Sequence, residues 1–74
     1  MSPIAIRLKD IREAKKLSQG ELAALADTRQ GTISLLESGK TRRIDLDLLE
    51  RIAEALDVEP ADLLVRMPKR RGPR

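Results

Sequence analysis

The chain of 74 residues contains no cysteine, no histidine and no aromatic residue. Without cysteine it forms neither a disulfide nor a thiolate metal site, which is consistent with a reducing, intracellular setting. The missing histidine, cysteine and tyrosine remove common nucleophiles and general bases, and the glycines form no phosphate loop. We therefore expect no enzymatic activity, no catalytic residue, no metal and no cofactor.

Long apolar runs are also missing. No stretch approaches the length of a membrane span, and residues 1–9 lack the hydrophobic core of a secretory signal. We expect a cytoplasmic protein with no membrane partner, free to associate with the nucleoid. The length allows one domain, whose small core is marginally stable unless dimerisation or ligand binding supports it.

The best-marked local pattern begins at Ser18. Ser18 and Glu21 are spaced as a capping box, in which each side chain satisfies a backbone N–H of the first helical turn. A helix is therefore predicted to start at Gln19 and to extend over about residues 19–26. Its apolar residues recur at helical spacing on one face: Leu22, Ala23 and Ala26.

A second short helix is predicted over about residues 29–37. Ile33 and Leu36 share its apolar face, and Gly39 follows where a left-handed cap is easiest for a residue without a Cβ atom. Two short helices joined by a tight turn form a helix-turn-helix motif.

Three further helices complete the prediction, and no segment is predicted to be a strand. The first covers about residues 4–16, with an apolar stripe of Ile4, Leu8, Ile11 and Ala14. The fourth covers residues 46–56 after an N-cap at Asp45, with an inward stripe of Leu46, Leu49, Ile52, Ala53 and Leu56. A short fifth helix begins at Pro60 and ends at about Arg66. The sequence thus predicts a compact five-helix, all-α domain over residues 1–66.

The spacing of these blocks resembles the XRE family, the Cro/repressor type of helix-turn-helix protein. The matching blocks are Leu17-Ser18-Gln19, Glu21-Leu22-Ala23, Thr32-Ile33-Ser34, Glu37-x-Gly39-Lys40, and a distal block from Leu49 to Val58 that is followed by Asp62-Leu63-Leu64. The resemblance covers about residues 6–65 and implies a lambda repressor-like fold that binds duplex DNA. The absence of aromatic stacking residues also favours duplex DNA over single strands or RNA.

Two positions depart from the family pattern. Asp27 stands where the family usually has glycine, although aspartate is among the residues that visit the left-handed region. The family prefers serine or threonine at the cap of the second motif helix, where the register places Arg29. Either Thr28 caps a helix that starts one residue earlier, or Arg29 occupies the cap position and reaches a phosphate.

The resemblance also implies which residues contact DNA. The second motif helix would enter the major groove and direct five residues toward the base edges: Gln30, Gly31, Thr32, Ser34 and Leu35. Phosphate contacts are expected from a largely basic set around this helix: Gln19, Arg29, Lys40, Arg42 and Arg43. Gln19 is included because a helix N-terminus attracts anions.

Two of the proposed base-contact residues have alternative interpretations. Gly31 is costly in a helix, by about 1 kcal/mol relative to alanine, so it indicates either a close approach to DNA or close packing of the two motif helices. Leu35 either contacts a thymine methyl group or turns inward beside Leu36, because it lies at the border of the buried face.

Two architectural features follow from the resemblance. Arg12 and Glu37 match positions that form an ion pair between the first and third helices. The protein is expected to be a homodimer, with an interface formed by Val58, Pro60, Ala61 and Leu64. Leu48, expected on the outer face of the fourth helix, is a second candidate contact, although an isolated exposed leucine is normal.

Charge is distributed unevenly along the chain. The segment from Asp45 to Asp62 carries seven acidic side chains and a single basic one, Arg51, whereas residues 66–74 carry five basic side chains and no acid. This pattern indicates one face suited to phosphates and another kept away from them, unless the charges simply form a mixed solvated surface. Residues 67–74 are expected to form a flexible basic tail. Within it, residues 69–74 are expected to act as an electrostatic arm on DNA, the alternative being a terminal solubility segment with no such role.

The predicted function is therefore sequence-specific binding of double-stranded DNA by a small transcriptional regulator, a repressor acting as a dimer on a palindromic operator. Two alternatives stay open. One is an antitoxin whose main partner is a toxin protein, and the other is a restriction-modification controller protein.

Overall fold

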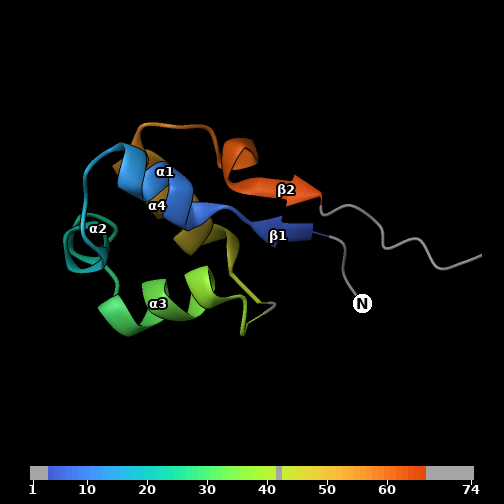
Figure 1. The fold of residues 1–74 in the computed structure, drawn as a ribbon, viewed down its shortest axis with the longest axis horizontal. Coiled ribbons are helices and arrows are strands. Elements are labelled where there is room, and N and C mark those ends of the chain that lie inside the picture. Colours follow the sequence, from blue (N-terminus) through green and yellow to red (C-terminus); the bar gives the residue numbers. More distant parts are fainter. Residues whose placement is uncertain (1–3, 42, 67–74) are drawn as a thin grey trace, which may run out of the picture.

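The computed structural model describes residues 4–41 and 43–66, and in this part of the chain four α-helices, one 3-10 helix and a two-stranded sheet occur (Figure 1). The elements are β1 (Ile4–Ile6), α1 (Leu8–Ala14), α2 (Gln19–Leu25), α3 (Gln30–Ser38), α4 (Leu46–Leu56), η1 (Pro60–Leu63) and β2 (Leu64–Arg66). The helices form a lambda repressor-like bundle, and the sheet lies at one end of it.

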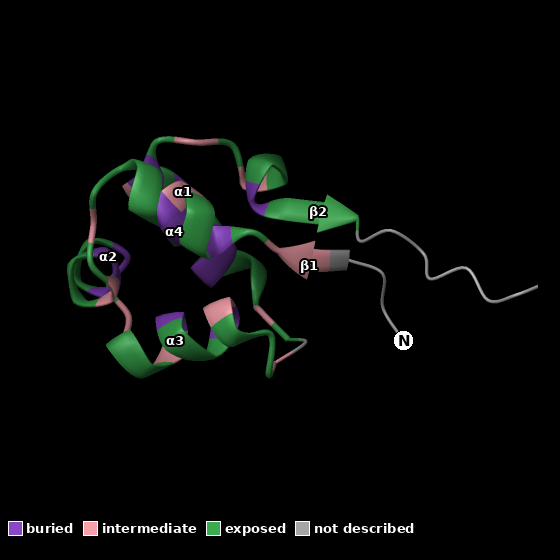
Figure 2. Ribbon diagram, viewed as in Figure 1, coloured by how far each residue is buried: buried purple, intermediate pink, exposed green. Residues whose placement is uncertain are grey.

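The core is built from aliphatic side chains alone. Its most deeply buried large side chains come from all four α-helices and from η1. Figure 2 marks buried residues in purple along the helices. The most deeply buried large side chains are Leu8, Leu22, Ile33, Ile52, Leu56 and Leu63. Burying an aliphatic side chain of this size contributes about 1.5–3 kcal/mol, so these few residues carry much of the stability.

The prediction that the chain contains no strand is wrong. Ile4–Ile6 pairs with Leu64–Arg66 in an antiparallel ladder, with Ala5 opposite Val65 and Ile6 opposite Leu64. Consequently the first helix starts at Leu8 rather than at residue 4, and the expected fifth helix is only the 3-10 turn η1. Its first turn is closed by Asp62, whose carboxylate accepts a hydrogen bond from the Glu59 backbone N–H at 3.1 Å.

The predicted apolar stripes of two helices need correction. Leu46, expected to face inward, is 81% exposed, whereas Leu48, expected on the outer face, is only 8% exposed and belongs to the core. Leu48 is therefore not a free contact patch. In α1 the predicted stripe ends early, because Ala14 is exposed and the buried partner of Leu8 one turn later is Arg12.

The helix termini follow the predicted capping chemistry. Asp45 caps α4 by accepting a hydrogen bond from the Leu48 backbone N–H at 2.7 Å. Gly39 ends α3 with φ of 76°, in the left-handed region where glycine has no steric cost. Within the described residues no helix has both the length and the apolar character needed to cross a bilayer.

Candidate nucleic-acid interface

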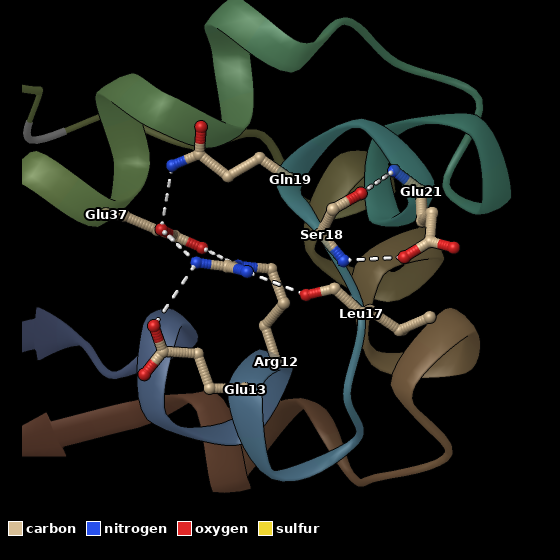
Figure 3. Close-up of polar contacts among 7 residues, drawn as sticks. All are labelled: Arg12, Glu13, Leu17, Ser18, Gln19, Glu21 and Glu37. Carbon is tan, nitrogen blue, oxygen red and sulfur yellow. Dashed lines mark hydrogen bonds and ion pairs between the residues drawn. The ribbon is translucent and has the colours of Figure 1, made fainter.

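Helix α2 is fixed at its start by the capping box that the sequence predicts. The Ser18 Oγ accepts a hydrogen bond from the Glu21 backbone N–H at 3.0 Å, and the Glu21 carboxylate accepts one from the Ser18 backbone N–H at 2.8 Å (Figure 3). Two backbone donors that a helix N-terminus leaves free are thereby satisfied. Helix α2 consequently begins at Gln19, as predicted.

The turn between α2 and α3 contains a left-handed residue that is not glycine. Asp27 has φ of 55°, and the next residue, Thr28, donates its backbone N–H to the Ala23 carbonyl oxygen at 2.8 Å. Arg29 is extended and occupies the cap position of α3, without a capping hydrogen bond from its side chain. Of the two alternatives for this cap, the structure therefore has Arg29 at the cap and the helix starting at Gln30.

Helix α3 separates its buried and exposed sides sharply. Ile33 and Leu36 face the core with 0% and 4% exposure, while four of the proposed base-contact residues are exposed and Thr32 is half-buried. The exposed four are Gln30, Gly31, Ser34 and Leu35. Leu35 is 50% exposed, so it does not extend the core beside Leu36.

Gly31 does not serve helix packing. A Cβ atom added at Gly31 would meet no described atom within 4 Å. The second interpretation of this glycine, close packing of the two motif helices, is therefore excluded. A glycine on an exposed helix face with free space around it is consistent with close approach of another molecule.

The C-terminal half of α3 is held to α1 by a buried ion pair. Arg12 donates two hydrogen bonds to the Glu37 carboxylate, one from Nε at 2.5 Å and one from a terminal nitrogen at 3.1 Å (Figure 3). The other terminal nitrogen donates to the Leu17 carbonyl oxygen at 2.7 Å. The two side chains are 9% and 5% exposed, and no buried side-chain nitrogen or oxygen of the described residues lacks a hydrogen-bond partner.

The environment of the ion pair determines its ionisation. Burial by itself would raise the pKa of Glu37, but hydrogen bonds from Arg12 and Gln19 and the charges of Arg12 and Lys9 outweigh it. The pKa of the Glu37 carboxyl therefore lies below its ordinary value. The hydrogen bond to Glu37 likewise raises the pKa of Arg12, so both partners are charged at neutral pH.

Gln19 has a structural contact that the sequence does not predict. Its side-chain nitrogen donates to the Glu37 carboxylate at 2.9 Å, so this carboxylate joins α1, α2 and α3 (Figure 3). The Gln19 side-chain amide is thus directed toward α3 rather than freely into solvent. A phosphate contact by Gln19 would then use its backbone N–H at the start of α2.

The basic residues expected at phosphates surround α3. Arg29 precedes the helix, Lys40 follows it, and Arg43 lies in the next loop; all three are exposed. Arg29 also lines an open hollow of about 550 Å³ together with Asp27, Thr28 and Thr32. The fourth expected cation, Arg42, lies outside the described residues, as does the basic tail over residues 67–74.

Comparison with known proteins agrees with this geometry. The sequence pattern of the helix-turn-helix family matches residues 8–63, which include all four α-helices. The chain belongs to this family. It is a DNA-binding transcriptional regulator of the XRE, Cro/repressor type.

Several relatives of this helix-turn-helix protein are regulators. It is 42% identical over 59 residues to the control protein C.BamHI of Bacillus amyloliquefaciens, covering 78% of this chain and 72% of that protein. The restriction-modification controller protein C.AhdI from Aeromonas hydrophila superimposes with a TM-score of 0.71 and 38% identity, over 76% of this chain and 80% of that one.

A third relative is HigA2 of Mycobacterium tuberculosis, whose name marks it as a candidate antitoxin. The identity is 36% over 63 residues, which is 85% of this chain. The chain spans only 61% of the length of HigA2.

The residues expected at a dimer interface of this helix-turn-helix protein lie together in the segment around η1. Val58 and Pro60 are half-buried, and Val58 packs against the core. Ala61 is exposed, and Leu64, at the start of β2, is 40% exposed. This segment forms a short 3-10 turn and a strand rather than the expected helix.

One residue that faces the helix-turn-helix turn was not singled out as a site residue from the sequence. Arg51 of α4 donates a hydrogen bond from Nε to the Ala26 carbonyl oxygen at 2.9 Å. The sequence feature that could have drawn attention to Arg51 is that it is the single basic residue in the acidic segment from Asp45 to Asp62.

Proposed function

We propose that this protein is a repressor that binds a palindromic operator as a homodimer, with α3 of each copy in a major groove. The observation that carries the proposal is the exposed face of α3, where a glycine with open space around it adjoins polar side chains and one leucine. An α-helix fits the major groove of B-form DNA, and the start of this helix is the part that reaches the bases.

The roles of the α3 side chains follow from their chemistry. Gln30 is suited to paired hydrogen bonds with adenine N6 and N7, and Ser34 and Thr32 both donate and accept. Leu35, half exposed beside these polar groups, is suited to a thymine methyl group. Because Gly31 has no side chain, the backbone of α3 could approach the DNA closely at this position.

Phosphate contacts position α3 without reading sequence. We assign this role to the exposed cations Arg29, Lys40 and Arg43 and to the backbone N–H of Gln19. Arg29 at the cap of α3 is placed where the positive end of the helix also favours an anion.

A selection from random duplexes tests the proposal. Two recognition helices related by a two-fold axis would meet successive major grooves, so the selected sequence should be a palindrome with half-site centres about 10–10.5 base pairs apart. The complex should contain two protein chains per duplex by light scattering. An asymmetric site bound by one chain, or no enriched sequence at all, would contradict the proposal.

Two substitutions separate base reading from phosphate contact. Gln30→Ala should lose about 1–3 kcal/mol of discrimination at one base position. Arg43→Ala should weaken binding to all duplexes about equally and reduce the slope of log K against log salt by about one. If Arg43→Ala changed the preferred base and Gln30→Ala did not, the assignment of α3 residues would be wrong.

A second candidate function is neutralisation of a toxin protein, which the similarity to HigA2 favours. The genes beside this one distinguish the candidates cheaply, because a restriction-modification system, a toxin gene or a phage region would each be recognisable. Where a toxin gene is present, co-expression and co-purification of the two proteins is the direct test.

A further inference from the structure

Arg51 connects α4 to the turn that leads into α3. Its Nε donates to the carbonyl oxygen of Ala26, the C-cap residue that follows the last residue of α2. Arg51 is also the single basic residue of an otherwise acidic segment. The roles assigned above to DNA-contacting residues do not include it.

The Ala26 carbonyl is an acceptor that needs a partner. The last carbonyl groups of a helix receive no hydrogen bond from a backbone N–H of the same helix. The C-terminal end of a helix also attracts positive charge. Helix α2 has no basic residue in its last turn, and Ala26 is only 1% exposed. Arg51 supplies from α4 the cationic donor that α2 lacks.

The same hydrogen bond fixes the direction of the chain after α2. The Ala26 carbonyl belongs to the peptide unit between Ala26 and Asp27, whose orientation is set by ψ of Ala26 at 4° and φ of Asp27 at 55°. A left-handed φ is less favourable for aspartate than for glycine. The N–H side of this peptide unit is held by a hydrogen bond from the Asp27 backbone N–H to the Ala24 carbonyl oxygen at 3.3 Å, and Arg51 holds its carbonyl side. The next two residues, Thr28 and Arg29, lead directly into α3.

Helix α3 is then held at both ends by side chains of other elements. Near its C-terminus, Glu37 is bound by Arg12 and Gln19, and before its N-terminus the turn is bound by Arg51. Between these points α3 packs on α2, and its Ile33 and Leu36 belong to the core. The first of these anchors acts on the end of α3 farther from the proposed base contacts, and the second acts on the nearer end.

We propose that Arg51 is a positioning residue for DNA recognition. By holding the Ala26–Asp27 peptide unit it sets the angle at which α3 leaves the turn, and so it determines sequence discrimination without contacting DNA. This inference rests on the proposed function of α3 as the base-reading helix.

Two substitutions at Arg51 separate the hydrogen bond from the charge. In Arg51→Gln the side-chain nitrogen occupies the same position along the side chain as the Arg51 Nε, so the bond to Ala26 can form without the positive charge. In Arg51→Met that position holds a methyl group, so charge and donor are both lost. The two variants have the same net charge and therefore the same non-specific attraction to DNA.

The measured quantity is the ratio of affinities for the selected duplex and for a shuffled duplex of equal length and composition. Binding is compared at a temperature where circular dichroism shows each variant to be folded. We expect Arg51→Met to lower this ratio about tenfold, since an unsatisfied buried acceptor allows the turn to change. Arg51→Gln should stay within about twofold of the unsubstituted protein. Equal ratios for Arg51→Gln and Arg51→Met would overturn the proposal.

A second measurement keeps the inference separate from the proposed function. Amide resonances of Asp27, Thr28 and Arg29 in the free protein should shift in Arg51→Met and stay near their original positions in Arg51→Gln. If the unsubstituted protein selects no duplex, the proposed function of α3 is contradicted. Unchanged amide resonances in Arg51→Met would contradict the positioning role of Arg51, whatever the selection shows. Should Arg51→Met not fold, Arg51→Ala replaces it, because alanine has neither charge nor side-chain donor and favours the helix. Equal ratios for Arg51→Ala and Arg51→Gln then overturn the proposal.

Discussion

At the scale of one residue, the proposed DNA approach at Gly31 predicts a cost in stability for the free protein. It is the second residue of α3, its surroundings are open, and glycine lowers helix stability relative to alanine by about 0.5–1 kcal/mol in a helix interior. Nothing in the described structure requires glycine at this position. A close approach of DNA, as proposed above for α3, would account for a residue without a side chain.

We predict that Gly31→Ala stabilises the free protein and weakens its binding to operator DNA. The stability gain should be about 0.5 kcal/mol, because the position lies near the helix end, and it is measured by urea unfolding. Affinity for the selected duplex should fall, because the added methyl group occupies the space through which DNA approaches. A variant that is more stable and binds equally well would show that Gly31 does not approach DNA.

Glu37 is the residue whose ionisation matters most for the fold. Its pKa is lower in the folded protein than its ordinary value of 4.5. The contribution of the ion pair is therefore fully present above pH 4.5 and is lost as the pH falls through the lower, folded-state pKa. Glu37→Gln should cost up to about 3–5 kcal/mol at neutral pH, because it leaves the Arg12 charge buried without an anionic partner.

The pH dependence can be isolated with a paired variant. Arg12→Met combined with Glu37→Gln removes both charges and keeps an amide oxygen as acceptor for Gln19. Urea midpoints between pH 7 and pH 3 should fall more steeply for the unsubstituted protein than for this variant. Parallel curves would mean that other carboxylates, and not Glu37, control stability in acid.

At the scale of the elements, helix caps explain where α2 and α4 begin. We predict that Asp45→Ala destabilises the protein by about 1 kcal/mol, because it removes the hydrogen bond to the Leu48 backbone N–H. Asp47→Ala is the matched control, since it removes the same charge from the first turn of α4 without removing a cap. Equal losses in thermal or urea unfolding would assign the effect to charge and the helix dipole alone.

The same local chemistry determines how much of the fold the sequence predicts. The capping box at Ser18, the cap at Asp45 and the left-handed Gly39 are specified by neighbouring residues, and these predictions are confirmed. Strand β1 was missed because Ile4, Leu8 and Ile11 have helical spacing, whereas the actual partner of Ile4–Ile6 lies about sixty residues away along the chain. Local patterns carry little information on such distant pairing.

Prediction of side-chain direction failed where the pattern was ambiguous. Leucine occupies three of the first four positions of α4, so spacing alone does not decide whether Leu46 or Leu48 faces inward. In the candidate site, the family register named the pair of Arg12 and Glu37, but not the third partner Gln19. The Gln19 contact depends on how α2 packs against α3, and the Arg51 contact depends on how α4 packs against the end of α2. Such packing between helices cannot be predicted from the sequence of one segment.

At the scale of the whole molecule, the small aliphatic core gives a modest free energy of unfolding, so binding of DNA should raise it by a measurable fraction. We predict that operator DNA at one hundred times its dissociation constant stabilises the protein by about 2.7 kcal/mol. For a domain of this size that corresponds to a rise in Tm of about 10–20 °C, measured by circular dichroism in the helical region. A shuffled duplex at the same concentration and salt should give a clearly smaller rise. Equal rises would mean that binding is electrostatic and does not read sequence.

The division of α3 into two sides has an evolutionary consequence. Ile33, Leu36 and Glu37 are tied to the body of the protein, whereas Gln30, Ser34 and Leu35 project from it with no described partner in the core. Mutations at the projecting positions are therefore close to neutral for folding. Descendants of this chain could acquire new operator sequences by single exchanges there, while the scaffold that presents them is inherited unchanged.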